Sequence, residues 1–113
     1  METRIKKSVA TLLVHIIKLD NRDIDKESPL FCQLMNQDFD CSSKEAKEFL
    51  YNIMKEDYNI EEHVKFIRDA LADDNYTKYK ILEQLNHIIY SDNIVDNDYK
   101  EFEKIKNILF DNK

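Results

Sequence analysis

Apolar residues recur at intervals of three and four along most of the chain, which is the spacing of one face of an α-helix. The first such stripe runs from Ile5 through Leu12 to Ile17. Short polar segments rich in Asp, Asn and Ser interrupt the pattern and divide the chain into six expected helices. We expect the first helix to stop at the turn 20–23 and the fifth to run from Tyr76 to Tyr90. The remaining helices are expected to begin near Asp25, after Ser42, at Asn59 and near Asp96.

Residues that favour helix starts support these boundaries. Ser42 with Glu45 three residues later matches a capping box, in which the serine hydroxyl accepts the N–H of the third helical residue. Asn59 is placed in the same way before the fourth helix. If the second helix starts near Asp25, Pro29 falls in its first turn, where a missing N–H costs little.

The composition supports an all-α fold. The chain has no glycine and one proline among its 113 residues, whereas hairpin-rich β folds depend on glycine wherever φ must be positive. The hydrophobic fraction of 42% is large enough for a core, and no linker divides the chain. We therefore predict a single domain over residues 1–113, a compact bundle of about six helices.

Charge and cysteine content narrow the classes of function. A net charge of −6 and a pI near 5.0 argue against nucleic-acid binding, because that needs a basic face to replace phosphate counterions. No apolar run approaches the roughly 20 residues that span a bilayer, and no signal-peptide cleavage site follows the N-terminal stretch. We expect a cytoplasmic protein without membrane insertion, in which Cys32 and Cys41 are reduced and partly buried.

The sequence contains one internal repeat. The segment 15–21 reads HIIKLDN, and the segment 87–93 reads HIIYSDN. Because the helix dipole disfavours an aspartate at a helix C-terminus, we expect Asp20 and Asp92 to have a role other than helix stability. Each Asp-Asn pair is followed by an apolar residue, a second aspartate and, two residues later, a further acid. These are Ile24, Asp25 and Glu27 in the first copy, and Val95, Asp96 and Asp98 in the second.

Each position of the repeat has a physical interpretation. Asn21 and Asn93 take the turn position that glycine usually fills, since asparagine tolerates the left-handed conformation. The second aspartate, Asp25 or Asp96, is suited to capping the next helix. Two copies at opposite ends of one small bundle are expected to lie side by side in a pseudo-two-fold arrangement.

At these residues the chain resembles the TerB-like family, which is named for tellurite resistance and also occurs in a DnaJ-like co-chaperone. The family is marked by two copies of a helix that ends in an Asp-Gly turn. An apolar residue, an aspartate and, three residues later, a glutamate then open the next helix. The glycine positions fall here on Asn21 and Asn93, the glutamate positions on Ser28 and Tyr99, and the acids Glu27 and Asp98 lie one position earlier.

The resemblance implies a non-enzymatic helical scaffold in bacterial responses to tellurite or other chemical stress. It also implies protein partners at the membrane or cell envelope and, through the paired acidic turns, cation binding. A small acidic immunity or inhibitor protein is a further alternative, and it would be favoured by co-purification with a basic partner. We expect no enzymatic activity, because the sequence supplies no nucleophile with a base, no phosphate-binding glycine loop and no cofactor motif.

A divalent cation such as Ca²⁺ or Mg²⁺ is the one candidate cofactor, because such ions take six or more oxygen ligands. The alternative is that the acids cap helices and solvate turns. Neither turn is an EF-hand loop: in the loop that starts at Asp92, Ile94 takes the third ligand position. The candidate ligands are Asp20, Asp23, Asp25, Glu27, Asp92, Asp96 and Asp98.

Histidine and tyrosine give two further candidates. His15 and His87 occupy matching places in the repeat and are candidate ligands for a transition metal, but their helical angles favour a structural or surface role. Tyr76, Tyr79 and Tyr90 flank the fifth helix. If they are exposed together, they mark a protein-binding patch. The alternative is that they are ordinary, partly buried tyrosines.

Overall fold

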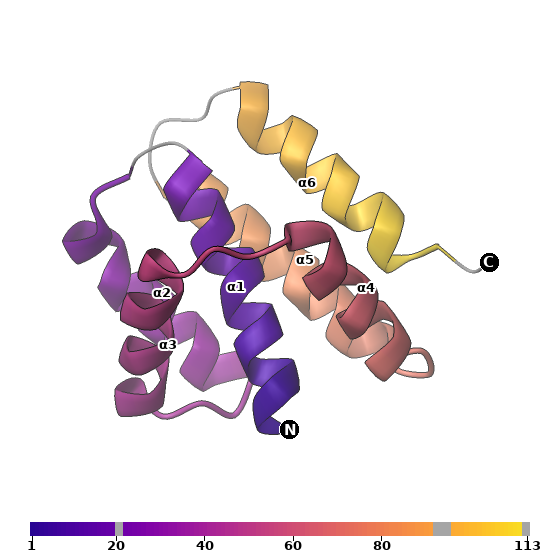
Figure 1. Cartoon of the computed structure of the whole chain (residues 1–113), viewed down its shortest axis with the longest axis horizontal. Helices are drawn as coiled ribbons and strands as arrows, with labels where there is room; N and C mark the ends of the chain where they lie inside the picture. Colours follow the sequence, from indigo (N-terminus) through magenta and orange to yellow (C-terminus); the bar gives the residue numbers. More distant parts are fainter. Residues whose placement is uncertain (20–21, 92–95, 112–113) are drawn as a thin grey trace.

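Six α-helices make up the part of the chain that the structure describes, and no strand occurs in it (Figure 1). The structure is a computed structural model that describes residues 1–19, 22–91 and 96–111. The all-α fold class and the helix number predicted above are therefore confirmed. The helices are α1 (Thr3–Leu19), α2 (Ile24–Asp38), α3 (Ser43–Lys55), α4 (Ile60–Ala70), α5 (Asn75–Tyr90) and α6 (Asp96–Leu109).

Helix α1 is the central element, and the other five helices pack around it (Figure 1). The sequence predicted one apolar stripe on this helix, but residues outside the stripe, such as Ala10, Thr11 and Val14, are also buried. The prediction was too narrow because neighbours cover α1 on several sides, so its small and β-branched residues leave the solvent as well. The N-terminal residue of the stripe, Ile5, is only partly buried.

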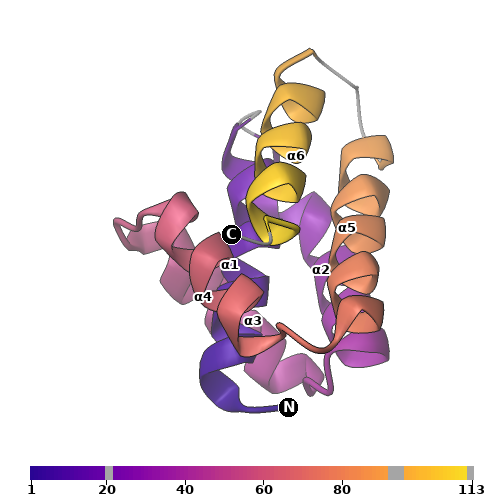
Figure 2. The same ribbon diagram turned by 90° about the vertical axis from the view of Figure 1, so that its right-hand side faces the viewer.

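The remaining helices form layers against α1. Helix α2 packs on α3 and α5, and α6 packs on both α4 and α5 (Figures 1 and 2). Each helix turns its predicted apolar face inward. Those faces include Phe31 and Met35 of α2, Leu50 and Ile53 of α3, and Ile81, Leu85 and Ile89 of α5.

Polar side chains cap the N-terminal ends of α2, α3, α4 and α5, and those of the last three are as follows. Ser42 Oγ accepts the Glu45 N–H at 3.1 Å, as the capping box predicts. Asn59 Oδ1 accepts the Glu62 N–H at 3.2 Å. Asp74 caps α5 by accepting the Thr77 N–H at 3.0 Å. Each of these caps satisfies an N–H that has no acceptor within its own helix.

The start of α2 differs from the prediction. Asp23 Oδ1 accepts the Asp25 N–H at 3.0 Å, so Asp23 caps the helix and α2 begins at Ile24. Asp25 is therefore a residue of the first turn and not the cap. Pro29 is the sixth residue of α2, inside the helix, where its missing N–H removes a hydrogen bond. Likewise Asp96 is the first residue of α6 and not its cap.

The turn between α2 and α3 contains a residue in the left-handed conformation, Asp40, with φ of 51°. The two asparagines predicted to take this conformation, Asn21 and Asn93, lie outside the described residues. Cys32 and Cys41 are both buried and free, as expected, and burial raises the pKa of the Cys41 thiol to about 12. No helix within the described ranges has the length and apolar character needed to cross a membrane.

Candidate functional site

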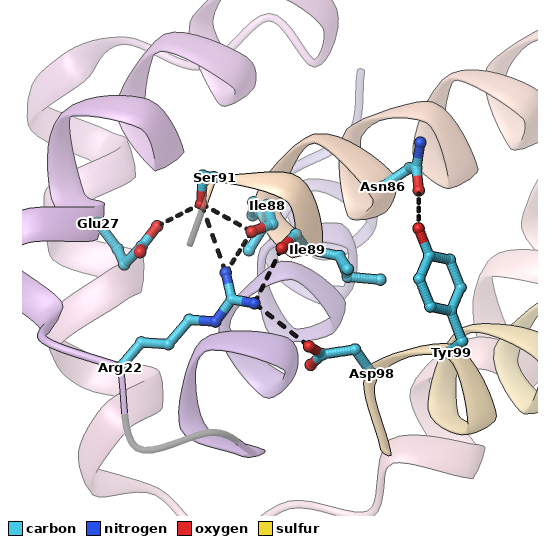
Figure 3. Close-up of polar contacts among 8 residues, drawn as sticks. All are labelled: Arg22, Glu27, Asn86, Ile88, Ile89, Ser91, Asp98 and Tyr99. Carbon is cyan, nitrogen blue, oxygen red and sulfur yellow. Dashed lines mark hydrogen bonds and ion pairs between the residues drawn. The ribbon is translucent and has the colours of Figure 1, made fainter. Parts of the chain in front are cut away.

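The residues that flank the two acidic turns meet at one end of the bundle. We call the end of α1 with the start of α2 the first corner, and the end of α5 with the start of α6 the second corner. Asp20, Asn21, Asp92 and Asn93 lie outside the described residues. The residues beside them are described, and those of the first corner contact those of the second (Figure 3). The prediction that the two copies lie side by side is confirmed for these flanking residues.

Arg22 of the first corner makes most of these contacts. Its Nη2 donates to the Ile89 carbonyl oxygen at 3.1 Å and lies 3.4 Å from Asp98 Oδ2. Its Nη1 donates to the Ile88 carbonyl oxygen and lies 3.4 Å from Ser91 Oγ (Figure 3). The planar guanidinium can serve these acceptors at once because its N–H groups point in fixed, divergent directions.

The acceptors of Arg22 include the end of a helix. The last carbonyl groups of a helix have no N–H partner within the helix, and they lie at the negative end of the helix dipole. Ile88 and Ile89 belong to the last turn of α5, so the charge of Arg22 stabilises that helix end. The side chain of Arg22 is 2% exposed and that of Asp98 is 0% exposed. The ion pair between them is therefore fully desolvated.

Glu27 joins the same cluster through Ser91. The Ser91 hydroxyl lies 3.0 Å from Glu27 Oε2 and 2.7 Å from the Ile88 carbonyl oxygen. Glu27 is buried, with 3% of its surface exposed. The third acid of each repeat copy, Glu27 or Asp98, therefore faces inward from the first turns of α2 and α6. We call Arg22, Glu27, Ser91 and Asp98 the arginine cluster (Figure 3).

The other candidate metal ligands are distributed differently. Asp23, Asp25 and Asp96 are exposed, and Asp23 is engaged as the cap of α2. Among the described residues, no group of three His, Cys, Asp or Glu side chains is arranged to hold a metal ion. A guanidinium, moreover, already provides a positive charge next to the buried Asp98. The described residues of the corners therefore do not by themselves supply the oxygen shell that a hard cation requires, and because Asp20 and Asp92 lie outside them, the cation site stays a prediction.

The histidines do not form a common site in the described structure. His15 Nε2 lies 2.9 Å from Glu101 Oε1, and His15 Nδ1 lies 2.9 Å from the Tyr58 hydroxyl. Because a carboxylate only accepts, Nε2 carries the ring proton. Burial, followed by the charge of Glu101, raises the pKa of Tyr58. His15 thus links α1 to α6 and to the segment before α4, whereas His87 is exposed on α5.

The three candidate tyrosines are exposed. The exposed fractions are 72% for Tyr76, 62% for Tyr79 and 61% for Tyr90. At 100° per residue these positions fall within about 60° of one another around α5. The alternative that they are ordinary, partly buried residues is therefore wrong for all three. Their role in protein contact stays a prediction.

Aromatic residues of α6 and of the segment after it extend this surface. The Tyr79 and Phe110 ring centroids are 4.8 Å apart, and those of Tyr90 and Tyr99 are 6.3 Å apart. We call this surface the tyrosine face, and it comprises Tyr76, Tyr79, Tyr90, Tyr99 and Phe110.

Comparison with known proteins bears on the whole chain. The family described as "Tellurite resistance protein TerB" matches residues 6–108 of the 113. The chain belongs to the TerB family. The matched range includes both corners and all but the start of α1 and the end of α6, so the TerB resemblance read from the repeat is confirmed. Searches of curated proteins and of solved structures gave no match.

In this TerB chain the two family glutamate positions do not carry the buried charges. Ser28 is a buried, uncharged residue of α2. Tyr99 is also uncharged, and its hydroxyl donates to Asn86 Oδ1 at 3.3 Å (Figure 3). The buried carboxylates are instead Glu27 and Asp98. The one-residue offset noted in the sequence thus keeps an acid at each corner, and both acids face the interior.

Arg22 is the residue of the arginine cluster that the sequence pattern did not indicate. In the sequence it belongs to the polar turn 20–23, where an arginine usually extends into solvent. The available signal was a basic residue between the first two acids of the first repeat copy, with no counterpart in the second. The direction of the Arg22 side chain depends on where the end of α5 lies. That position is set by tertiary packing, which a local sequence pattern does not show.

Proposed function

We propose that this TerB domain is a non-enzymatic protein-binding module that docks a partner on its tyrosine face. The family description suggests a place in a bacterial stress response of the tellurite-resistance type. We further propose a cytoplasmic location, which the two buried, free cysteines favour. The observation that carries the proposal is the exposure of Tyr76, Tyr79 and Tyr90 along one side of α5.

Exposed tyrosines in this arrangement are suited to binding. Tyrosine offers a large contact area together with a hydroxyl, and it is enriched in the centres of protein interfaces. Ring contacts with Phe110 and Tyr99 hold Tyr79 and Tyr90 in place before any partner arrives. A side chain that is already ordered loses less entropy on binding, so the face is partly preorganised.

The partner that fits this face has a basic segment. The chain carries a net charge of −6, which attracts a positively charged partner over a long range. The tyrosine rings also suit cations at short range, because the face of an aromatic ring is electronegative. Lys80 Nζ lies 5.7 Å from the centroid of the Tyr76 ring, so one ring of the surface already receives a cation. An arginine-bearing segment of a partner makes the same contact at Tyr90.

The test is affinity capture followed by measured binding. The full chain and the variant Tyr76→Ser/Tyr90→Ser are immobilised and exposed to extract of the native organism. Each captured protein is then purified and its dissociation constant is measured at two salt concentrations. We expect a partner with a basic segment whose binding weakens at least tenfold in the double variant and weakens further with salt.

A matched control separates the tyrosine face from exposed tyrosine in general. Tyr51 is 44% exposed but belongs to α3, away from this face. Tyr51→Ser is expected to bind the partner as the unmodified chain does. Equal loss in both variants, or no loss in the double variant, contradicts the proposal.

A further inference from the structure

A pocket lies between the first two turns of α1 and the first two turns of α4. Its volume is about 340 Å³, at the small end of the range for ligand sites. Helix α1 contributes Arg4, Lys7 and Ser8, and α4 contributes Glu62, His63 and Phe66. None of these residues belongs to the arginine cluster or to the tyrosine face.

A partly buried hydrogen bond fixes the inner part of the pocket. Ser8 is 4% exposed, and its Oγ lies 3.0 Å from His63 Nδ1. When the Ser8 hydroxyl donates this bond, the ring proton of His63 is on Nε2. Within the described residues no protein group is bonded to Nε2. The imidazole is thus held at one nitrogen and has a donor available at the other.

Two cations border the same space. The guanidinium of Arg4 lies over the Phe66 ring, 4.4 Å from its centroid, and makes no ion pair with a described residue. Stacking on an aromatic ring leaves the N–H groups at the edge of the guanidinium available for an anion. Lys7 Nζ lies 3.4 Å from Glu56 Oε1, and the Lys7 side chain is 44% exposed.

The electrostatic environment of the pocket differs from that of the chain as a whole. The chain is acidic, but this pocket lies at the N-terminal ends of two helices, where the helix dipoles are positive. Burial and the charge of Lys7 lower the pKa of His63, while the nearby carboxylates of Glu56 and Glu62 oppose that change. The balance of these effects favours the neutral ring of His63. Among the described residues that line the pocket, Glu62 is the one acid, and it is exposed.

We propose that this pocket binds the phosphate group of a small molecule, with Arg4, Lys7 and His63 as its donors. A tetrahedral phosphate presents oxygens in several directions, which matches three donors from two helices better than a planar carboxylate does. The guanidinium binds two oxygens side by side, and the ammonium and the imidazole Nε2 bind the others. The ring of Phe66 offers an apolar surface for the remainder of the molecule.

Phosphate titration of the isotopically labelled full chain tests the site, with the His63 ring signals followed by NMR. Inorganic phosphate and glycerol 3-phosphate are titrated separately, each against sodium chloride of equal ionic strength. We expect saturable shifts of the His63 signals with phosphate and none with chloride. The pKa of His63 should rise at saturation, because the bound anion stabilises the imidazolium. Tighter binding of inorganic phosphate would identify the free ion as the ligand, and tighter binding of glycerol 3-phosphate would identify a phosphate monoester.

Three variants are expected to weaken, strengthen and leave unchanged the binding of phosphate. Arg4→Gln should weaken phosphate binding about tenfold, because it removes the bidentate donor. Glu62→Gln should strengthen binding, because it removes the repelling charge at the rim. Lys44→Gln removes an exposed lysine of α3 and should leave binding unchanged. The proposal is overturned if neither phosphate compound gives a saturable shift, or if Arg4→Gln and Lys44→Gln bind equally.

Discussion

The side chain of Arg22 extends from the first corner to acceptors at the second, and its charge is buried together with that of Asp98. Removing one partner of a buried ion pair leaves the other charge desolvated and uncompensated. We expect Arg22→Met to lower the free energy of unfolding by about 3–5 kcal/mol. Urea denaturation followed by circular dichroism measures this change.

The double variant Arg22→Met/Asp98→Leu is the control for that prediction. It replaces both charges by apolar groups, so no buried charge is left without a partner. Such replacements are often close to neutral, and we expect the double variant to recover most of the stability lost in Arg22→Met. The single variant Asp98→Leu completes the comparison. If the losses of stability in Arg22→Met and Asp98→Leu simply add in the double variant, Arg22 and Asp98 do not interact as described.

Asp74 provides a test at the start of α5. Its carboxylate accepts the Thr77 hydroxyl at 2.6 Å and the Thr77 N–H at 3.0 Å, and these hydrogen bonds lower the pKa of Asp74. Asp74→Ala should cost roughly 0.5–1 kcal/mol at pH 7. Because the folded pKa is lowered, the carboxylate's contribution is present above the normal aspartate pKa and is lost as pH falls through the lowered value.

The pH dependence of that loss is measured by thermal unfolding between pH 7 and pH 2.5. The difference between the unmodified chain and Asp74→Ala should shrink below about pH 4. Asp74→Asn keeps a capping oxygen but does not titrate. We expect Asp74→Asn to be nearly as stable as the unmodified chain at pH 7. A constant difference across the pH range for Asp74→Ala would show that the charge of Asp74 contributes nothing.

Divalent cations test the interpretation of the buried acids. Glu27 and Asp98 face Ser91 and Arg22, so we expect neither to bind an added cation. A ligand present at 100 times its dissociation constant adds about 2.7 kcal/mol, which raises the melting temperature of a domain of this size by several degrees. We expect no such rise with millimolar Ca²⁺, Mg²⁺, Mn²⁺ or Zn²⁺. A rise that is lost in Asp98→Asn would restore the metal site.

Part of the site was accessible from the sequence at this scale. The repeat indicated Glu27 and Asp98 as candidate metal ligands, because the repeated acids can be recognised from residue type and spacing alone. It did not show that these two face inward while Asp23, Asp25 and Asp96 are exposed. That division depends on which side of α2 and α6 meets the rest of the bundle, and the packing of distant helices decides it.

At the scale of the helices, apolar periodicity predicted the number and type of elements correctly. Capping residues gave the starts of α3 and α4 for a physical reason: Ser42 and Asn59 offer oxygens to N–H groups that lack other acceptors. The start of α2 was misplaced because two aspartates compete for the cap, and Asp23 takes it. The burial of α1 on more than one side was missed because a periodic stripe indicates one covered face and not the number of neighbours.

The earlier start of α2 leads to a prediction about Pro29. Proline inside a helix removes a hydrogen bond and crowds the carbonyl four residues earlier, which here is that of Asp25. Pro29→Ala should therefore raise the free energy of unfolding by about 1–2 kcal/mol, after allowing for the greater entropy of the unfolded chain. Urea denaturation measures it. A loss of stability would show that the proline ring makes contacts worth more than the missing hydrogen bond.

At the scale of the whole molecule, α1 is the common partner of the other helices, and the arginine cluster joins the two corners at one end of the bundle (Figures 1 and 3). Helix α5 takes part in both the arginine cluster and the tyrosine face. Its buried side contacts α1 and α2, its last carbonyls accept from Arg22, and its outer side carries the exposed tyrosines. Fixing the end of α5 therefore also fixes Tyr90.

The central claim is that Arg22 holds the two acidic corners together, and hydrogen exchange in Arg22→Lys tests it most directly. Lysine keeps the charge but lacks the planar fork that reaches α5 and Asp98 at the same time. We predict faster amide exchange in the last turn of α5 and the first turns of both α2 and α6, with α3 and α4 unchanged. Lys44→Arg, on the exposed side of α3, should change none of them. Faster exchange confined to the first corner, or no change at either corner, would contradict the claim.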